Sequence, residues 1–313
     1  LNMDENVLKS WLEDERLTDY RRYISEILRS KEHTLDKKTE EILAKSRKMS
    51  SAPENIYSMY NGADIDFPEI ENNGEKIKIT HGNFIPIMSG TDRELRKKAF
   101  KGVYNTYGSM KNTIAATFNA NVEQACFFAD VRNYSSTRAM YLDSANVPES
   151  VYDNLIETVH EHMDLMYRYV DLRKKALKVD ELHMYDIYAP IVDVPDKKYF
   201  FDEAKKMVKE GLAPMGKEYL EKLQEGFDNR WIDIYENEGK RSGAYSWGAY
   251  GTHPYVLLNY HGTLDHVFTL AHEMGHALHS YYSDKNQPYI NAGYKIFVAE
   301  VASTCNESLL IHY

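Results

Sequence analysis

Cysteine is scarce in this chain of 313 residues, which contains only Cys126 and Cys305. Two thiols that lie far apart in sequence are too few for a disulfide framework or for a zinc site made of thiolates. Such a composition is typical of a reducing compartment, so we expect a cytoplasmic protein. The opening segment LNMDENVLKSWLEDERL is polar with helical periodicity and lacks the apolar core of a secretory signal.

Long apolar runs and basic segments are missing too. No run approaches the roughly 18 apolar residues that a membrane-spanning helix needs, which argues against a membrane as a partner. The formal net charge is −10, with no long basic block, so the field of the protein repels duplex nucleic acid. With 43% apolar and 27% charged residues, the composition indicates a globular protein with a sizeable core.

Helical periodicity dominates the chain, and the sequence predicts a mainly α protein. A break is expected at Pro53 and another near Pro214. The segments with apolar residues at helical spacing are 7–30, 34–63, 92–142, 150–177, 200–227, 264–284 and 294–312.

A few segments have strand character instead. The alternating stretch KIKITHGNFIPIM, residues 76–88, predicts a β-hairpin that turns at His81-Gly82-Asn83. LHMYDIYAPIVDVP (182–195) and YVLLNY (255–260) are also expected to form strands. We therefore predict a helical N-terminal region over 1–180, which includes the hairpin, and a second region over 181–313 with a small sheet.

The stretch TLAHEMGHALHSYYS carries the most specific chemical signal. His272 and His276 lie four residues apart, so on a helix both imidazoles project from one face and can share a zinc ion. Glu273 lies about 100° round the helix, beside the ion, where it could take a proton from zinc-activated water. The pattern also occurs by accident, and an isolated histidine more often packs in a core or lies on the surface. A third ligand is needed to decide.

Glu300 provides a candidate third ligand on the next predicted helix. Its neighbours Phe297, Val298, Val301 and Ala302 are apolar, and a carboxylate buried among them would need a compensating cation. An ordinary salt bridge is the alternative. The motif helix has apolar residues on nearly every side, which predicts burial, and Gly275 within it predicts close approach of another backbone. Together these features favour a zinc site.

Several blocks of the sequence resemble one known family. GAYSWGAYGTHPYVLLNYHGTLDHVFTLAHEMGHALHSYYS and FVAEVASTCNE strongly resemble the oligoendopeptidase F branch of the thimet-oligopeptidase-like zinc metallopeptidases. ITHGNFIPIMSGTDRELRKKAF, FADVRNYSSTRAMYLDSANVPESVYDNLI and LHMYDIYAPI also fit it, so the resemblance covers most of the chain. It implies a zincin-like helical fold with a small β-sheet beside the HExxH helix and a deep channel that admits short peptides.

The resemblance also implies roles for individual residues. His272, His276 and Glu300 would bind one Zn²⁺ and Glu273 would be the general base in the hydrolysis of internal peptide bonds of oligopeptides. YVLLNY resembles the strand that aligns the substrate, and an edge strand can read a peptide backbone without its side chains. Ordinary packing is an equally good interpretation for the substrate-binding candidates, which are Tyr250, His253, Tyr255, Leu257 and Asn259.

Three further residues could support the ligands. Glu307 lies two helical turns beyond Glu300 and could orient a ligand histidine, and Asp265 and His279 each lie seven residues from His272. Surface charge or helix capping is the alternative for each of them. Cys305 is expected to be a packed thiol.

Members of the family continue well beyond the equivalent of Tyr313. The resemblance therefore implies that the second region, 181–313, is only the start of the catalytic domain. The missing part would supply one channel wall and the groups that bind the oxyanion, as a complementary C-terminal fragment or chain. Leu1 in place of an initial methionine agrees with a piece of a longer protein.

Two other functions stay open at this point. A non-catalytic module that binds peptide and metal is one, although an intact Glu273 favours an enzyme. A peptidyl-dipeptidase of the angiotensin-converting type is the other, since it shares HEMGH, but the GAYSWGAYGTHPYVLLNY block argues against it.

Overall fold

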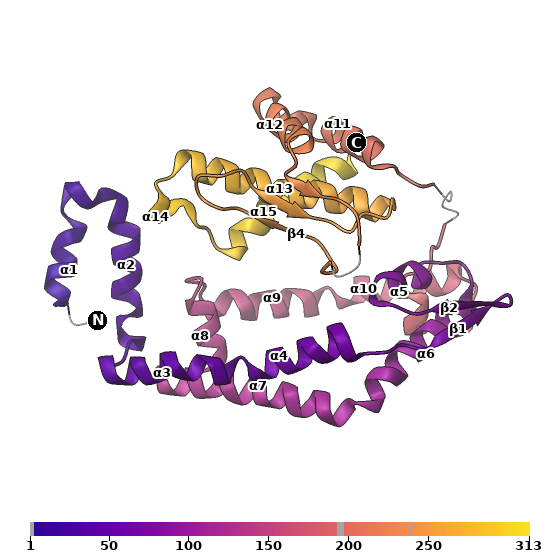
Figure 1. The fold of residues 1–313 in the computed structure, drawn as a ribbon, viewed down its shortest axis with the longest axis horizontal. Coiled ribbons are helices and arrows are strands. Elements are labelled where there is room, and N and C mark those ends of the chain that lie inside the picture. The colour runs from indigo at the N-terminus through magenta and orange to yellow at the C-terminus, as the bar shows by residue number, and fades with distance from the viewer. Residues whose placement is uncertain (1–2, 193–196, 238–239) are drawn as a thin grey trace. The chain divides into compact units, whose positions relative to one another are not determined.

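Helices make up most of the structure, as the sequence predicts (Figure 1). The computed structural model describes residues 3–192, 197–237 and 240–313. The chain divides into two compact units. The first holds residues 32–192, and the second holds residues 3–31 together with 197–237 and 240–313. The expected division at 180/181 differs from this one, because residues 3–31 belong with the C-terminal unit.

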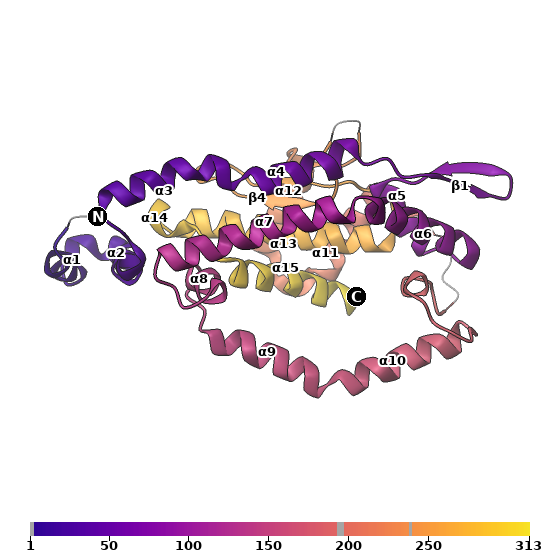
Figure 2. The same ribbon diagram turned by 90° about the horizontal axis from the view of Figure 1, so that it is seen from below.

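The first unit is built from consecutive helices. A short break at Ser51 separates α3 from α4, and Pro53 lies in the first turn of α4, as expected. α4 and α7 lie side by side (Figure 2). The described helices of this unit are α3 (Lys37–Ser50), α4 (Ala52–Met59), α5 (His81–Met88), α6 (Arg93–Ser109), α7 (Lys111–Val131), α8 (Thr137–Asp143), α9 (Glu149–Glu161) and α10 (Met163–Ala176).

The β-hairpin of this unit lies earlier in the chain than predicted. β1 (Glu69–Asn72) pairs with β2 (Glu75–Lys78) through a turn at Asn73-Gly74, whose φ angles are 52° and 86°. Both angles are positive, which Asn-Gly accommodates and which matches the twist of the two strands. The predicted turn at 81–83 is wrong. Those residues begin α5, because the side chains of Thr80 and Asn83 each accept a hydrogen bond from the other's backbone N–H.

The strand predicted over 182–195 is also wrong as far as residue 192, and residues 193–195 lie outside the described part. In its place a short 3₁₀ turn spans Met184–Asp186. The Asp186 carboxylate is fully buried and accepts hydrogen bonds from Arg93 Nε and Nη2 and from Arg96 Nη2, at 2.9–3.0 Å. Arg173 Nη2 donates to the Asp186 and Ala189 carbonyls. Arginine side chains, through ion pairs and hydrogen bonds to carbonyls, therefore hold this segment in place of the expected strand pairing.

The second unit centres on two long helices. α13 (Leu264–Asn286) and α15 (Ile296–Ile311) pack along each other, and α11 (Phe201–Gly211) packs on both. α12 (Lys217–Asp228) and α14 (Tyr289–Ala292) complete this layer. The predicted break near Pro214 is confirmed by a 3₁₀ turn, Ala213–Met215. The core of the unit gathers around the buried side of α13.

Residues 3–31 form a helical pair rather than one helix. α1 (Glu5–Leu12) ends before Asp14, whose side chain accepts a hydrogen bond from the Arg16 N–H and begins a 3₁₀ helix, Glu15–Tyr20. α2 (Arg21–Arg29) follows. Arg22 fastens the pair to α14 and to the residue that follows it, because its guanidinium donates to Asn291 Oδ1 and to the carbonyls of Ile290 and Gly293 at 3.3 Å.

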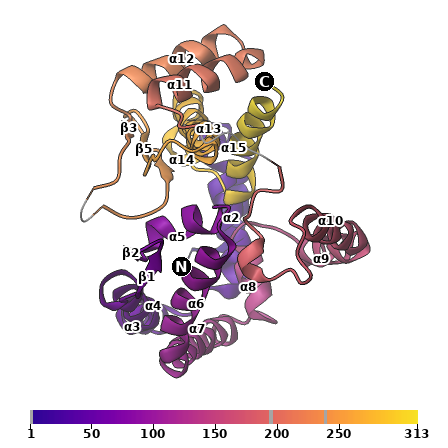
Figure 3. The same cartoon turned by 90° about the vertical axis from the view of Figure 1, so that its right-hand side faces the viewer.

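A small sheet packs on α13. Its strands are β3 (Ile232–Asp233), β4 (Tyr245–Trp247) and β5 (Tyr255–Leu257), in the order β3-β5-β4, and Figure 3 shows β3 beside β5. β5 forms the first three residues of the predicted YVLLNY strand, and it pairs on both sides, parallel to β3 and antiparallel to β4. The prediction that it is an edge strand is therefore wrong. Among the described strands the edges of this sheet are β3 and β4.

A search of the described residues for a helix long and apolar enough to cross a membrane finds none.

Candidate metal centre

The HExxH motif lies on the most deeply buried helix of the second unit. The side chain of Thr263 caps α13 by accepting a hydrogen bond from the His266 N–H. Burial extends over most of the helix, as predicted, although Leu264 is exposed. The buried positions of α13 are Val267, Leu270, Ala271, Glu273, Met274, Gly275, Ala277, Leu278 and Ser280.

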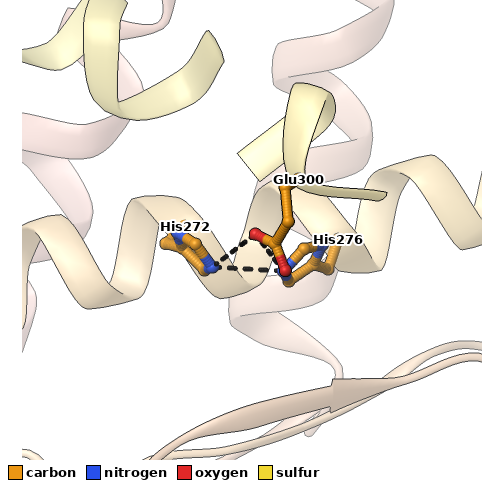
Figure 4. Close-up of side chains that lie close together, drawn as sticks. All are labelled: His272, His276 and Glu300. Atoms are coloured by element: carbon orange, nitrogen blue, oxygen red, sulfur yellow. Dashed lines mark hydrogen bonds and ion pairs between the residues drawn. The ribbon is translucent and has the colours of Figure 1, made fainter. Parts of the chain in front are cut away.

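Gly275 is the point where α15 comes closest to the motif. A Cβ atom at this position would lie 2.8 Å from Ser303 Cα and 2.9 Å from the Ala302 carbonyl oxygen, both backbone atoms. The predicted close approach of a second backbone is thus confirmed. This contact brings Glu300, one turn before Ser303 on α15, to the face of α13 that carries the two histidines (Figure 4).

Three donor atoms converge between the two helices. His272 Nε2 and His276 Nε2 lie 3.1 Å apart, and Glu300 Oε2 lies 3.5 Å from the first and 3.6 Å from the second. Ligands at zinc's usual distance of 2.0–2.1 Å in a tetrahedron are about 3.3 to 3.4 Å from one another. The three edges therefore match one face of a zinc tetrahedron, and the donor set fits the ion.

The ring nitrogens are in the right state for a metal. Burial, together with the neighbouring His272, lowers the pKa of His276, so its imidazole is neutral at pH 7. The other nitrogen of His272, Nδ1, lies 2.6 Å from Glu307 Oε1. A carboxylate at that distance accepts the Nδ1 proton and leaves the Nε2 lone pair free for a ligand bond. The predicted pairing of Glu307 with a ligand histidine is present in the structure.

Replacement of Glu307 should weaken metal binding. We expect Glu307→Ala to lower zinc affinity about 10- to 100-fold, because the His272 ring loses the partner that fixes its orientation and tautomer. Glu307→Gln keeps an acceptor oxygen and should lose less. Competition with a chromogenic chelator measures both affinities. Glu221→Gln, an exposed change on α12, serves as control, and equal affinities in all four proteins would contradict the assignment.

Glu273 has an unusual environment for a carboxylate. Only 7% of its surface is exposed. Burial raises the pKa of Glu273 to about 7, and the nearby His272 and Glu300 shift it in opposite directions by smaller amounts. A carboxyl group with this pKa can both accept and return a proton near neutral pH, which suits a general base that later acts as a donor.

The burial argument for Glu300 is not supported. Its side chain is 46% exposed, and the flanking Phe297, Val298 and Val301 are exposed as well. Those neighbours are apolar, as the sequence shows, but they lie on the exposed side of α15 and so do not bury the carboxylate. Its position against the histidines, rather than an apolar surrounding, makes Glu300 a candidate ligand. Ser303 Oγ donates to Glu300 Oε2 at 2.9 Å and orients it.

The other two candidates for ligand support lie elsewhere on α13. Asp265 is exposed in the first turn, and its described contacts do not include His272; a carboxylate there suits the helix N-terminus. His279 stacks on Tyr294, with ring centroids 3.9 Å apart, and burial lowers its pKa. Neither touches the donor triangle. The expectation that Cys305 is packed is wrong, because its side chain is exposed on α15.

The residues predicted to bind substrate make different kinds of contact in the structure. Tyr250 is exposed, donates to the Gln287 carbonyl and meets Tyr289. His253 stacks on Trp231 and touches Tyr255, which is half exposed on β5. Asn259 Nδ2 donates to the Arg241 and Gly243 carbonyls and so fixes a loop. Leu257 is partly buried. Their part in substrate binding stays a prediction.

Sequence reasoning missed two buried residues of α15 that hold the site in position. Asn306 is almost fully buried, donates to the Ala271 carbonyl and accepts from the Tyr219 hydroxyl. Ser303 is fully buried and hydrogen-bonded to Glu300. Both lie three residues apart on the α15 face that carries Glu300, and that spacing was the only signal available in the sequence.

Comparison with known proteins identifies the family of the chain. The sequence model of peptidase family M3 matches residues 87–313, and the model described as oligopeptidase F matches residues 1–67. The chain belongs to peptidase family M3. Oligopeptidase PepF of Bacillus subtilis is 48% identical over the whole chain, and the chromosomal oligoendopeptidase F of Lactococcus lactis subsp. cremoris is 44% identical over 99% of it.

Solved structures show the same relationship. The crystal structure of oligoendopeptidase-F from Enterococcus faecium matches 99% of this chain with a TM-score of 0.70 and 34% identity, and the matched part is 49% of that chain. The match covers 47% of the Bacillus protein and 52% of the Lactococcus protein. This M3 chain thus spans about half the length of the curated relatives it matches.

Proposed function

We propose that this chain carries the metal centre of a zinc-dependent endopeptidase that hydrolyses internal bonds of short oligopeptides. The triangle of donor atoms from His272, His276 and Glu300 carries the proposal. Membership of peptidase family M3, and relatives named oligopeptidase or oligoendopeptidase F, support the same reaction class.

The three side chains would hold one zinc ion through His272 Nε2, His276 Nε2 and Glu300 Oε2. The bound ion would supply Lewis acidity toward a peptide carbonyl and toward water at this site. Three protein ligands with a fourth position open to solvent and substrate are the pattern of a catalytic zinc site rather than a structural one.

Glu273 would handle the protons of the reaction. Its carboxylate takes a proton from the attacking water and returns it to the leaving amine. Its buried surroundings, which raise its pKa to about 7, bring its basicity close to that needed at neutral pH. Asn306 holds α15 against α13 and Ser303 orients the Glu300 carboxylate, so that the base and the ligands keep one geometry.

The substrate backbone would run along the small sheet. β4 packs on α13 and lies at an edge of the three described strands, and its Tyr245 and Trp247 are exposed. An extended peptide can add to such an edge through main-chain hydrogen bonds, which read length and conformation more than sequence. This arrangement supports oligopeptides as substrates and predicts broad sequence tolerance.

A complementary polypeptide is the second proposed partner. α15 exposes Ile296, Phe297, Val298, Val301 and Ile311, an apolar surface of the kind that a partner covers. We propose that this surface is covered by the part of the relatives that this chain does not match. That part would supply the groups that bind the oxyanion, and loss of one such donor typically lowers the rate about 10²- to 10³-fold.

Zinc content and hydrolysis of a quenched oligopeptide test the proposal directly. The chain, purified without chelator, should hold one zinc ion, and cleavage should disappear with a chelator and return with zinc. Metal analysis of His276→Ala should show loss of the ion. A chain that takes up no zinc would overturn the ligand assignment.

A metal-binding module without activity is the second candidate, and the half-length match to the relatives favours it for this chain alone. Zinc uptake without cleavage would identify this case. Addition of the matching C-terminal half of a relative should then restore hydrolysis if the endopeptidase proposal is correct, and continued inactivity would leave the module as the better description.

A further inference from the structure

A cavity lies beside α13, the helix that carries the metal centre, toward the C-terminal end of that helix. Its volume is about 270 Å³. Ser280 and Asp284 of α13 line one side of it, and Tyr250, Tyr289, Gly293 and Tyr294 line the others. None of these residues belongs to the proposed catalytic set. The cavity therefore needs an explanation of its own.

Three tyrosines line the cavity, and contacts with one another or with other side chains hold their rings in place. Tyr250 and Tyr289 meet edge to face, with centroids 5.3 Å apart and an interplanar angle of 81°. The Tyr294 hydroxyl lies 2.6 Å from Ser280 Oγ, and the Tyr294 ring stacks on His279. The faces of tyrosine rings carry partial negative charge and attract cations within about 6 Å.

Asp284 adds a full negative charge to this wall. Its carboxylate is partly buried, and burial raises its pKa. No cation in the described part of the chain pairs with it. The adjacent Lys285 instead contacts Glu218 and the rings of Tyr281 and Tyr282. A partly desolvated carboxylate without a counter-ion is unfavourable, and a bound cation would remove that cost.

The neighbouring arginine does not fill this role. Arg22 directs its guanidinium to the carbonyls of Ile290 and Gly293 and to Asn291. Asn291 Nδ2 in turn donates to the Asp19 carbonyl. These contacts fasten the chain segment that carries Gly293 and Tyr294, and so keep one wall of the cavity in position without neutralising Asp284.

We propose that this cavity binds a protonated primary amine, held by the Asp284 carboxylate and the surrounding tyrosine rings. On the basis of the proposed peptidase function, the amine would be a lysine side chain or the free N-terminus of an oligopeptide substrate. Asp284 lies eight residues beyond His276, about 12 Å along the helix axis. An extended peptide advances about 3.3 Å per residue, so the amine would lie three to four residues from the bond that is cleaved.

Binding of n-butylammonium to the metal-free chain tests the cavity without any catalysis. Titration followed by calorimetry or ligand-observed NMR should show saturable binding, while n-pentanol, which has the same shape without the charge, should bind far less. Asp284→Asn should weaken amine binding at least about tenfold, the loss expected for a charge-assisted hydrogen bond. Tyr289→Ala removes an exposed ring and should weaken amine binding about threefold or more.

Glu221→Gln provides the matched control, since it removes one exposed negative charge on α12 outside the cavity. Equal affinity for the amine in Asp284→Asn, Tyr289→Ala and the unchanged chain would overturn the proposal. Because the titration needs neither zinc nor turnover, its result is separate from the fate of the peptidase proposal.

The source of the amine follows from competition by peptides. A peptide with lysine should displace n-butylammonium better than its norleucine counterpart if the side chain binds. Loss of competition on N-terminal acetylation would identify the terminal amine instead. Equal competition by the lysine and norleucine peptides, each with a free and with an acetylated N-terminus, would overturn the inference that the amine belongs to a substrate.

Discussion

Glu273→Gln is expected to abolish peptide hydrolysis while the zinc ion stays bound. The amide has almost the same shape as the carboxylate but cannot accept the proton of the attacking water. Loss of a general base typically lowers the rate about 10²- to 10⁴-fold. Steady-state hydrolysis of a quenched oligopeptide, with zinc content measured on the same samples, checks the prediction, in the reconstituted protein if the chain alone is inactive.

Structural damage can be separated from the loss of the base. Glu273 is buried and burial raises its pKa, so a neutral side chain there should not lower the melting temperature of the metal-free chain. Asp171→Asn, an exposed change on α10, gives the matched control. Activity of Glu273→Gln within tenfold of the unchanged protein would show that another group accepts the proton.

Asp186→Asn is expected to destabilise the first unit by about 3 to 5 kcal/mol, because it leaves the guanidinium of Arg96 buried without its carboxylate. For a unit of this size the melting temperature should fall by about 10 °C. The three tryptophans, Trp11, Trp231 and Trp247, all belong to the second unit. A melting curve followed by far-UV circular dichroism should therefore show the lower melting temperature of the first unit. A melting curve followed by tryptophan fluorescence reports any effect on the second unit. A fall seen by fluorescence alone would contradict the assignment.

The same carboxylate makes the first unit sensitive to acid. Burial alone would raise the pKa of Asp186, but hydrogen bonds from Arg93, the His183 N–H and Arg96 outweigh it and hold the pKa at about 2. The unfolded chain binds the proton first, near pH 4, so the stabilisation is complete above that pH and is lost as the pH falls toward 2. The loss should be about 2 kcal/mol. In Asp186→Asn the melting temperature should change less over this range.

The sequence by itself determined the kind of protein and located the residues of its candidate metal centre. Periodicity located most helices, and the HExxH spacing placed two imidazoles and a carboxylate on one rod, since a helix repeats every 3.6 residues whatever surrounds it. The glycine at 275 correctly indicated a close second backbone. These inferences succeeded because each depends on local geometry alone.

Local signals failed where neighbours competed. The alternation over 76–80 is real, but the mutual cap of Thr80 and Asn83 converts the following residues into a helix. The 182–192 segment has the pattern of a strand, yet its backbone carbonyls accept hydrogen bonds from Arg96, 89 residues before its partner, and from Arg173, 13 residues before its partner. A single sequence does not reveal such partners.

Only the tertiary structure decided how the centre is assembled. The contact of Gly275 with Ser303 sets the approach of α15, and this brings Glu300 Oε2 within 3.6 Å of both ring nitrogens and Glu307 against His272. The structure also turned the apolar neighbours of Glu300 outward, made β5 a central strand, and formed the tyrosine-walled cavity at Asp284 from three separate segments. Each of these depends on the packing of residues distant in sequence, which helical periodicity and motif spacing do not encode.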